Sequence, residues 1–158
     1  MEGLELSRLR TMVNVAAEMT QEARTASERD RDYYDEHQWT DAEVKELQAR
    51  KQPVITINRI KRKVDAMIGL EQRMRIDPKA FPRTPNDEEA AAAATEALVF
   101  VDDNTRLDAK RSLVFENVAV EGYGAVEIIV EPKRDRNEIV INRLRWEELF
   151  FDPHSREK

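Results

Sequence analysis

The sequence contains no cysteine, and this absence removes two kinds of site at once. Without thiols the chain forms neither a disulfide nor a thiolate-ligated metal centre. No apolar run approaches the roughly 20 residues that a membrane-spanning helix needs. The first residues also lack the apolar segment of a secretory signal. We therefore expect a protein of the cytoplasm that does not enter a membrane.

Glycine is scarce, with four in 158 residues. A loop that cradles phosphate needs clustered glycines at a strand-to-helix turn, whereas Gly122 and Gly124 have neither a third glycine nor a following lysine. This pair is better interpreted as a helix stop followed by the entry to a strand. The sequence therefore predicts no nucleotide loop.

Histidine is rarer still, and His37 and His154 are far apart in polar segments. A metal site that uses Asp152 and His154 is conceivable, but no His-x-x-x-His or His-x-x-Glu spacing supports it. Carboxylates are so numerous that no pair of them stands out. We expect no catalytic residues, no metal and no cofactor.

Charge is what the chain has in abundance. Charged residues make up 37% of the sequence, and the formal net charge is -6. The mean hydropathy of -0.70 predicts a surface that is solvated or paired with partner chains. A negative balance disfavours general binding to nucleic acid or to membranes, since both attract basic proteins. The length suits one domain with a modest core.

Apolar periodicity and capping residues predict an α+β fold that is mostly helical. The expected helices are a long N-terminal one from Leu4 to about Asp32, then 41–51, 58–75, 86–103 and 105–120. The residues interpreted as N-caps are Thr40, Asn58, Thr84 and Thr105. Alternating apolar residues at 125–131 and 138–144 predict a β-hairpin.

The long N-terminal helix changes character halfway along. Its first half carries an apolar stripe, but beyond Met19 small and charged residues dominate. We expect this second half to face solvent or another subunit. As organisation we expect one partial domain over 1–158, with a projecting helix at 1–32, a helical body at 33–121 and a hairpin with an aromatic cluster at 122–151.

The block from Tyr33 to Gly69 holds the candidate interface residues. Three aromatic residues gather at its start: Tyr33, Tyr34 and Trp39. They either form a small satellite core that closes the end of the long helix, which we favour, or anchor an interface.

A basic cluster follows in the same block, made of Arg59, Lys61, Arg62 and Lys63. Cations at a helix N-terminus oppose the helix dipole, so this placement gives up local stability. One hypothesis is that the cluster meets phosphate or an acidic neighbour. The other, which we favour, is a solvated face paired with the chain's own carboxylates.

A set of residues in fixed order runs from about residue 29 to the end of the chain. They are Tyr33, Tyr34, Asp35, Gln38, Trp39, Pro53, Thr56, Ile57, Asn58, Gly69, Gly122, Gly124, Glu127, Asp152, Pro153 and His154. Their order and spacing resemble the N-terminal part of phage portal proteins of the short-tailed enterobacterial virus type. One departure is Glu36, which stands where such proteins commonly have glycine.

The resemblance implies the wing region of a ring subunit, usually one of twelve copies, and no enzymatic activity. Such a ring is the head-to-tail connector at one vertex of a virion, and double-stranded DNA is packaged and ejected through its channel. The implied partners are a terminase, capsid or scaffold proteins and tail adaptors, with assembly in the host cytoplasm. Because the stem and clip of such proteins lie beyond this sequence, we expect this chain alone to be a monomer or weak oligomer. The alternative is a free-standing helical adaptor or scaffold domain that binds a protein partner.

Overall fold

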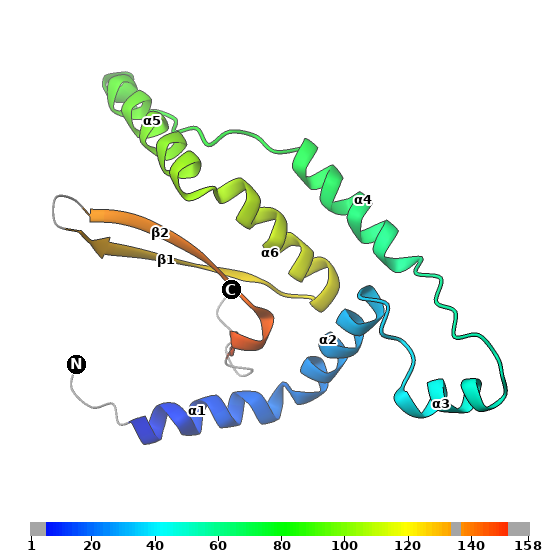
Figure 1. Cartoon of the computed structure of the whole chain (residues 1–158). Coiled ribbons are helices and arrows are strands. Elements are labelled where there is room, and N and C mark those ends of the chain that lie inside the picture. Colours follow the sequence, from blue (N-terminus) through cyan, green and yellow to red (C-terminus); the bar gives the residue numbers. More distant parts are fainter. Residues whose placement is uncertain (1–5, 134–136, 152–158) are drawn as a thin grey trace.

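The computed structural model describes residues 6–133 and 137–151, and over these residues the chain is mostly helical with one β-hairpin (Figure 1). The helices are α1 (Leu6–Met19), α2 (Gln21–Tyr34), α3 (Asp41–Ala49), α4 (Ile60–Arg73), α5 (Glu88–Thr105) and α6 (Leu107–Glu121). The strands are β1 (Ala125–Pro132) and β2 (Asn137–Leu144), and two short 3-10 turns are η1 (Pro85–Asp87) and η2 (Trp146–Glu148). The predicted fold class is confirmed.

Helix α6 is the centre of the arrangement. Helices α2, α4 and α5 and strand β2 all pack against it, whereas α1 and α3 extend away on opposite sides of the molecule (Figure 1). The two strands pair antiparallel, with Ile128 opposite Ile141 near their middle. β2 is the strand that α5 and α6 contact. β1 therefore forms the outer side of the sheet.

The N-terminal segment is helical as predicted, but it bends at Thr20 and so forms two helices. The Thr20 hydroxyl donates a hydrogen bond of 2.6 Å to the Ala16 carbonyl, and Thr20 has φ -102° and ψ 7°. The backbone hydrogen bond from Thr20 N to Ala16 O continues across the bend. A hydroxyl that bonds back to the carbonyl of residue i-4 often accompanies a bend in a helix, and here the bend occurs without proline or glycine.

The expectation that the second half of this segment faces solvent or another subunit was wrong for one face of α2, although most of its residues are exposed. α2 packs on α6 of the same chain, and Ser27 is buried at the contact. The Ser27 hydroxyl donates a hydrogen bond of 2.8 Å to the Glu121 carbonyl. Small side chains allow two helices to approach closely, so the loss of the apolar stripe marked a helix with one polar contact face and one exposed face.

Three of the four predicted caps hold the start of a helix or turn. Thr40 and Glu43 form a reciprocal capping box at α3, and Thr84 forms one with Asp87 at η1. The Asn58 side-chain oxygen accepts hydrogen bonds from the backbone N–H groups of Ile60 and Lys61. These contacts satisfy N–H groups that a helix start leaves without a partner.

The prediction that Thr105 caps the start of a helix was wrong, because this residue ends α5 and does not begin α6. Its hydroxyl donates to the Val101 carbonyl one turn earlier in α5, at 2.8 Å. Arg106 then adopts a left-handed conformation, with φ 50° and ψ 46°, and this residue separates the two helices. The Thr105 hydroxyl is hydrogen-bonded within α5, so it does not cap α6.

The apolar core is thin. The apolar residues buried among the described residues are Ala16, Tyr34, Val64 and Ile141. Large apolar side chains are exposed on α1, α4, α5 and β1 and in the segment between α3 and α4. Scattered exposed apolar residues are normal, whereas contiguous ones mark interaction surfaces. This distribution is typical of a chain that buries further apolar surface against partner chains.

Gly124 lies close to α6, and its replacement by alanine is expected to be destabilising. An added Cβ would lie 2.8 Å from the backbone oxygen of Val114, so the start of β1 would have to move away from α6. Forced displacement of packed backbone typically costs about 1–3 kcal/mol. Urea unfolding of Gly124→Ala measures this loss directly.

Gly69 in the interior of α4 is the matched control. An added Cβ there meets nothing within 4 Å. Alanine is favoured over glycine inside a helix by roughly 1 kcal/mol, so Gly69→Ala should raise the free energy of unfolding. Equal effects of the two substitutions would contradict the close approach at Gly124.

Candidate assembly interface

Tyr34 lies at the joint where α2 ends and α4 begins. Its side chain is buried, and its hydroxyl donates a hydrogen bond of 2.8 Å to Asp65 Oδ1 in α4. The cationic groups of Arg31 and Lys61 lie over its ring, at 5.2 and 5.3 Å from the centroid. Burial and the hydrogen bond to Asp65 raise the pKa of Tyr34 above its ordinary value. Tyr34 is therefore a structural link between the two helices.

Asn58 closes the base of the loop that carries α3. Its amide nitrogen donates to the backbone carbonyls of Tyr33 and Tyr34, at 3.2 and 2.8 Å. Trp39 Nε1 donates to the Thr56 hydroxyl oxygen at 3.1 Å, a second tie across the same loop. Because these bonds join residues 17 to 25 positions apart, the loop leaves and re-enters the body at one place.

The other two predicted aromatics stay at the surface. Tyr33 is 41% exposed and Trp39 is 38% exposed. The ring-to-ring contacts among the described residues occur elsewhere, where Tyr123 meets Trp146 and Phe151 edge to face. The structure thus buries Tyr34 and leaves Tyr33 and Trp39 partly exposed.

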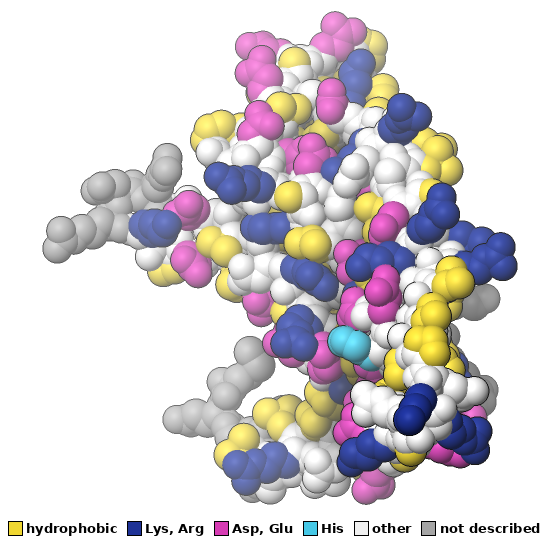
Figure 2. All heavy atoms as spheres, turned by 45° about the vertical axis from the view of Figure 1, so that its right-hand side comes forward, with side chains coloured by type: hydrophobic (Ala, Val, Ile, Leu, Met, Phe, Trp, Pro, Cys, Tyr) yellow, Lys and Arg dark blue, Asp and Glu magenta, His cyan; other side chains and the backbone are white. Residues whose placement is uncertain are grey.

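The basic cluster lies at the start of α4, and three of its members are free of ion pairs within the part of the chain that the structure describes. Arg59, Arg62 and Lys63 are exposed and carry no such pair, whereas Lys61 contacts the Tyr34 ring. Asp65 lies one helical turn after Arg62, but it accepts the hydrogen bond from the Tyr34 hydroxyl, and the positions one turn after Arg59 and Lys63 hold no carboxylate. These three residues lie on an exposed face, as the hypothesis that we favoured requires, but they show none of the pairing with described carboxylates that it also included. On the face that includes α3 and α4, apolar side chains lie among the charged ones (Figure 2).

Arg31 ties α2 to α6 through two carboxylates. Its Nε donates to Glu121 Oε1 at 2.6 Å, and its Nη1 donates to Glu116 Oε1 at 2.9 Å. The Glu121 side chain has no exposed surface, and its Oε2 has no hydrogen-bond partner among the described residues. Burial raises the pKa of Glu121, and the neighbouring Arg31 only partly offsets this effect.

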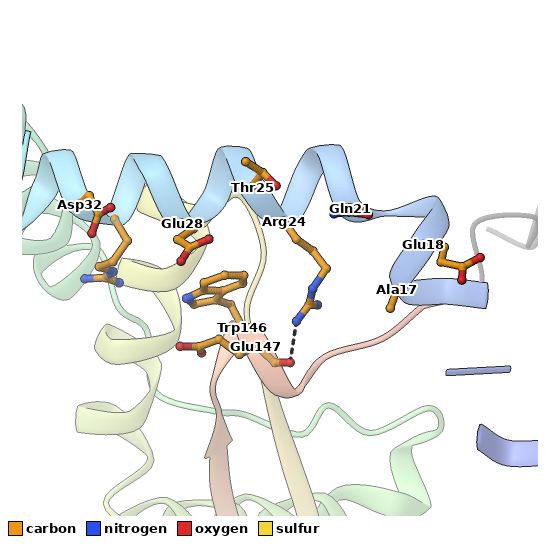
Figure 3. Close-up of a pocket in the computed structure, with 10 residues that line it drawn as sticks. Ala17, Glu18, Gln21, Arg24, Thr25, Glu28, Asp32, Trp146 and Glu147 are labelled. Carbon is orange, nitrogen blue, oxygen red and sulfur yellow. Dashed lines mark hydrogen bonds between the residues drawn. The ribbon is translucent and has the colours of Figure 1, made fainter. Parts of the chain in front are cut away.

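Arg24 holds the segment after the hairpin against α2. Its guanidinium donates to the Glu147 carbonyl at 2.8 Å (Figure 3) and to the Leu149 carbonyl at 3.1 Å. It also lies over the rings of Trp146 and Phe150, at 5.5 and 4.7 Å from their centroids. A groove of about 540 Å³ runs along α2 here, lined by side chains of both charges. Among the residues that line it, Arg24 binds the Glu147 carbonyl, and Glu147 Oε2 is buried without a hydrogen-bond partner among the described residues.

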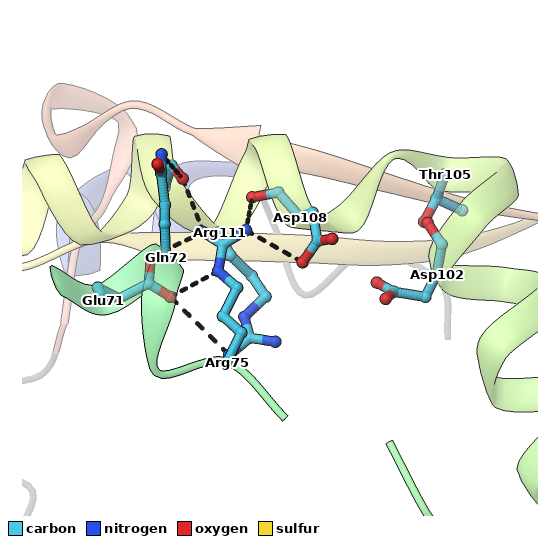
Figure 4. Close-up of polar contacts among 8 residues, drawn as sticks. Glu71, Gln72, Arg75, Asp102, Thr105, Asp108 and Arg111 are labelled. Carbon is cyan, nitrogen blue, oxygen red and sulfur yellow. Dashed lines mark hydrogen bonds and ion pairs between the residues drawn. The ribbon is translucent and has the colours of Figure 1, made fainter. Parts of the chain in front are cut away.

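Arg75 makes the third tie, between the end of α4 and α6 (Figure 4). It pairs with Glu71 at 2.7 Å and donates to the Asp108 carbonyl at 2.7 Å and to the Ser112 hydroxyl at 2.7 Å. Three arginines thus hold α2, α4 and the C-terminal segment to one another and to α6.

The three arginine contacts hold the fold together. Over residues 6–133 and 137–151, no group of three or more His, Asp or Glu side chains is placed to hold a metal ion. The conceivable metal pair at Asp152 and His154 lies outside the described residues. No helix in the described part of the chain is both long and apolar enough to cross a membrane. What remains is a body held by arginine contacts, with apolar and cationic surface left uncovered. Uncovered apolar surface of this kind marks surfaces that interact with other chains.

The family follows from the sequence match. The family model for phage P22-like portal proteins matches residues 10–158, which is nearly the whole chain. The chain belongs to this family, so it is a structural, non-enzymatic subunit of an oligomeric portal ring, the head-to-tail connector of a phage. No curated protein matches the sequence. The resemblance seen in the sequence is confirmed.

Sequence reasoning missed the three arginines that hold the body together. Arg24, Arg31 and Arg75 bind partners up to 125, 90 and 37 residues away in the chain. No local spacing sets them apart from the other basic residues, because the signal lies in the tertiary contact. The aromatic residues and the basic cluster could be recognised from the sequence because the members of each group lie close together along the chain.

Proposed function

We propose that these residues form the wing region of a portal ring of twelve copies. In this proposal residues 33–121 form the helical body and residues 122–151 form the hairpin with its aromatic cluster. Helix α1 is the projecting part of the 1–32 segment. The proposed partners of the ring are a terminase, capsid or scaffold proteins and tail adaptors, with double-stranded DNA in the channel. Its proposed place is a capsid vertex of the virion, reached by assembly in the host cytoplasm.

The observation that supports the ring is the presence of uncovered apolar surface on two separate parts of the subunit. One part is α1, where Leu9 and Met12 are 51% and 58% exposed. The other is α4 with the segment before it, where Ile57 and Met74 are 79% and 69% exposed. In Figure 1 these parts lie on opposite sides of the molecule. A head-to-tail ring needs two different, complementary surfaces on each subunit, and a symmetric dimer needs only one.

The charge balance supports passage of DNA in preference to tight binding. The net charge of -6 gives the chain no general attraction for phosphate. An acidic channel wall releases no counterions from DNA, so the electrostatic part of binding is absent and the duplex can slide.

Mass photometry and negative-stain microscopy of the full-length gene product test this proposal. We expect closed rings of about a dozen copies, because a head-to-tail contact continues until the ring closes. A free-standing adaptor, the rival function, would stay a monomer or dimer at high protein concentration. That result would overturn the ring.

A further inference from the structure

The segment between α3 and α4 has the features of a strand without a partner. Residues 52–58 run without a turn or bend, and 53–57 make no backbone hydrogen bond to any described residue. Val54, Ile55 and Ile57 are 39%, 60% and 79% exposed. β-branched residues suit extended backbone, and open N–H and C=O groups on such backbone are those that a sheet edge binds.

β1 offers a sheet edge of the matching kind. The sheet has two strands, and the only backbone hydrogen bonds that β1 makes to other described residues are those with β2. Val126, Ile128 and Val130 alternate along one face of β1 and are 38%, 66% and 60% exposed. A two-stranded sheet is marginal by itself, and an exposed apolar edge is a template for a further strand.

The side chains of the two segments suit one another. In extended backbone Ile55 and Ile57 share one face, just as Val126, Ile128 and Val130 do on β1. Cross-strand pairs of branched apolar side chains stabilise a sheet. A strand added beside β1 would therefore cover apolar side chains that are now exposed on both segments.

The charges are complementary as well. β1 contains Glu127 and Glu131 and no cation, and both glutamates are exposed. The segment 49–64 contains no carboxylate, and the basic cluster begins directly after Ile57. Complementary charge steers two surfaces together and fixes their register.

The occupant of the β1 edge is a second copy of this chain. Residues 53–57 and the hairpin lie on opposite sides of the subunit (Figure 1), so one copy cannot pair them with each other. A head-to-tail ring, by contrast, brings one side of each copy against the other side of the next. We propose that residues 53–57 of one subunit join the free edge of β1 in its neighbour and extend that sheet to three strands. This inference rests on the proposed ring and names its contact.

A proline pair tests the hydrogen-bond ladder in the full-length gene product. Adjacent N–H groups of a strand point in opposite directions, so only one of Val54 and Ile55 can donate to the β1 edge. Of the variants Val54→Pro and Ile55→Pro, one should lose rings and the other should keep them, because proline is tolerated where the N–H faces solvent. Val54→Ala and Ile55→Ala are the matched controls that shorten the side chain but keep the N–H. All four should unfold near the wild-type temperature, since 53–57 makes no backbone hydrogen bond within its own subunit.

Engineered disulfides test the pairing itself, and the natural absence of cysteine makes the readout clean. Ile55→Cys is combined in one chain with a cysteine at Val126, Ile128 or Val130. One of the three double variants should form a ladder of covalent multimers on non-reducing gels. Ile55→Cys with Ile139→Cys is the control, because β2 would lie two strand spacings away, roughly 9–10 Å, beyond the reach of a disulfide.

The possible outcomes distinguish failure of the proposed strand addition from failure of the proposed ring. Rings that form equally with both prolines, and that give no ladder with any cysteine pair, would overturn the strand addition and leave the ring standing. Loss of rings with both prolines also contradicts it, because an added strand has one free edge. If the wild-type protein formed no rings, the proposed function would be overturned, and the strand addition that rests on it would fall with it.

Discussion

Replacing Arg31 by alanine is expected to lower the free energy of unfolding by about 3 kcal/mol. The guanidinium binds Glu116 and Glu121, and the Glu121 side chain has no exposed surface. Removing one partner of a buried ion pair leaves the other charge buried without compensation, and that penalty is larger than the net value of the pair. Thermal and urea unfolding of Arg31→Ala measure the loss.

The same substitution should show a characteristic pH dependence. Glu121 has a raised pKa in the folded chain because of burial, so the folded state holds this proton more tightly than the unfolded state. Its contribution to stability is therefore present at acid pH and lost as the pH rises through the folded pKa. Without Arg31 this pKa rises further. The destabilisation of Arg31→Ala should be smaller at about pH 5 than at about pH 7.

Two further variants isolate the cause. Arg29→Ala removes an exposed ion pair from the same helix, where the side chains of Arg29 and Asp30 are 61% and 46% exposed, and should cost little. Adding Glu121→Gln to Arg31→Ala should restore part of the stability, because the buried charge is then gone. If Arg29→Ala proved as costly as Arg31→Ala, the two-carboxylate contact would not be the reason.

Reversing the charge of the basic cluster is expected to block ring assembly without unfolding the subunit. Arg59→Glu, Arg62→Glu and Lys63→Glu together remove three cations that have no ion pair with the described residues. Lys61 is kept because it contacts the Tyr34 ring. Each exposed pair contributes up to about 1 kcal/mol, so losing three pairs should raise the concentration for half-assembly by up to roughly a hundredfold. Mass photometry over a concentration series measures it.

A charge exchange identifies the partner of the cluster. If the cluster faces β1 of the next copy, adding Glu127→Lys and Glu131→Lys to the triple variant should restore rings. If it contacts DNA, the triple variant should still form rings, and its duplex binding should depend less steeply on salt. That second pattern would contradict an assembly role for these cations.

Much of the fold is visible in the sequence because its signals are local. The capping boxes at Thr40 and Thr84 and the left-handed stop at Gly122, with φ 89°, depend on residues within one turn. The hairpin follows from alternation and a polar turn. Thr105 shows the limit of this reasoning, since its spacing to Asp108 matched a cap while its hydroxyl was bonded one turn earlier in α5.

The sequence by itself determined the helix and strand content, the absence of catalytic constellations and the family, because each depends on residue types in a fixed order. Only the tertiary structure decided that α2 lies on α6, that Arg31 joins two carboxylates of α6, and that the basic cluster stays unpaired among the described residues. The bend at Thr20 belongs to the same group, because the same threonine hydroxyl can bond either to its own helix or to solvent. The physical reason is the large sequence separation of the residues that make these contacts. Contacts between residues 85 to 125 positions apart depend on the path of the whole chain, and no local pattern encodes them.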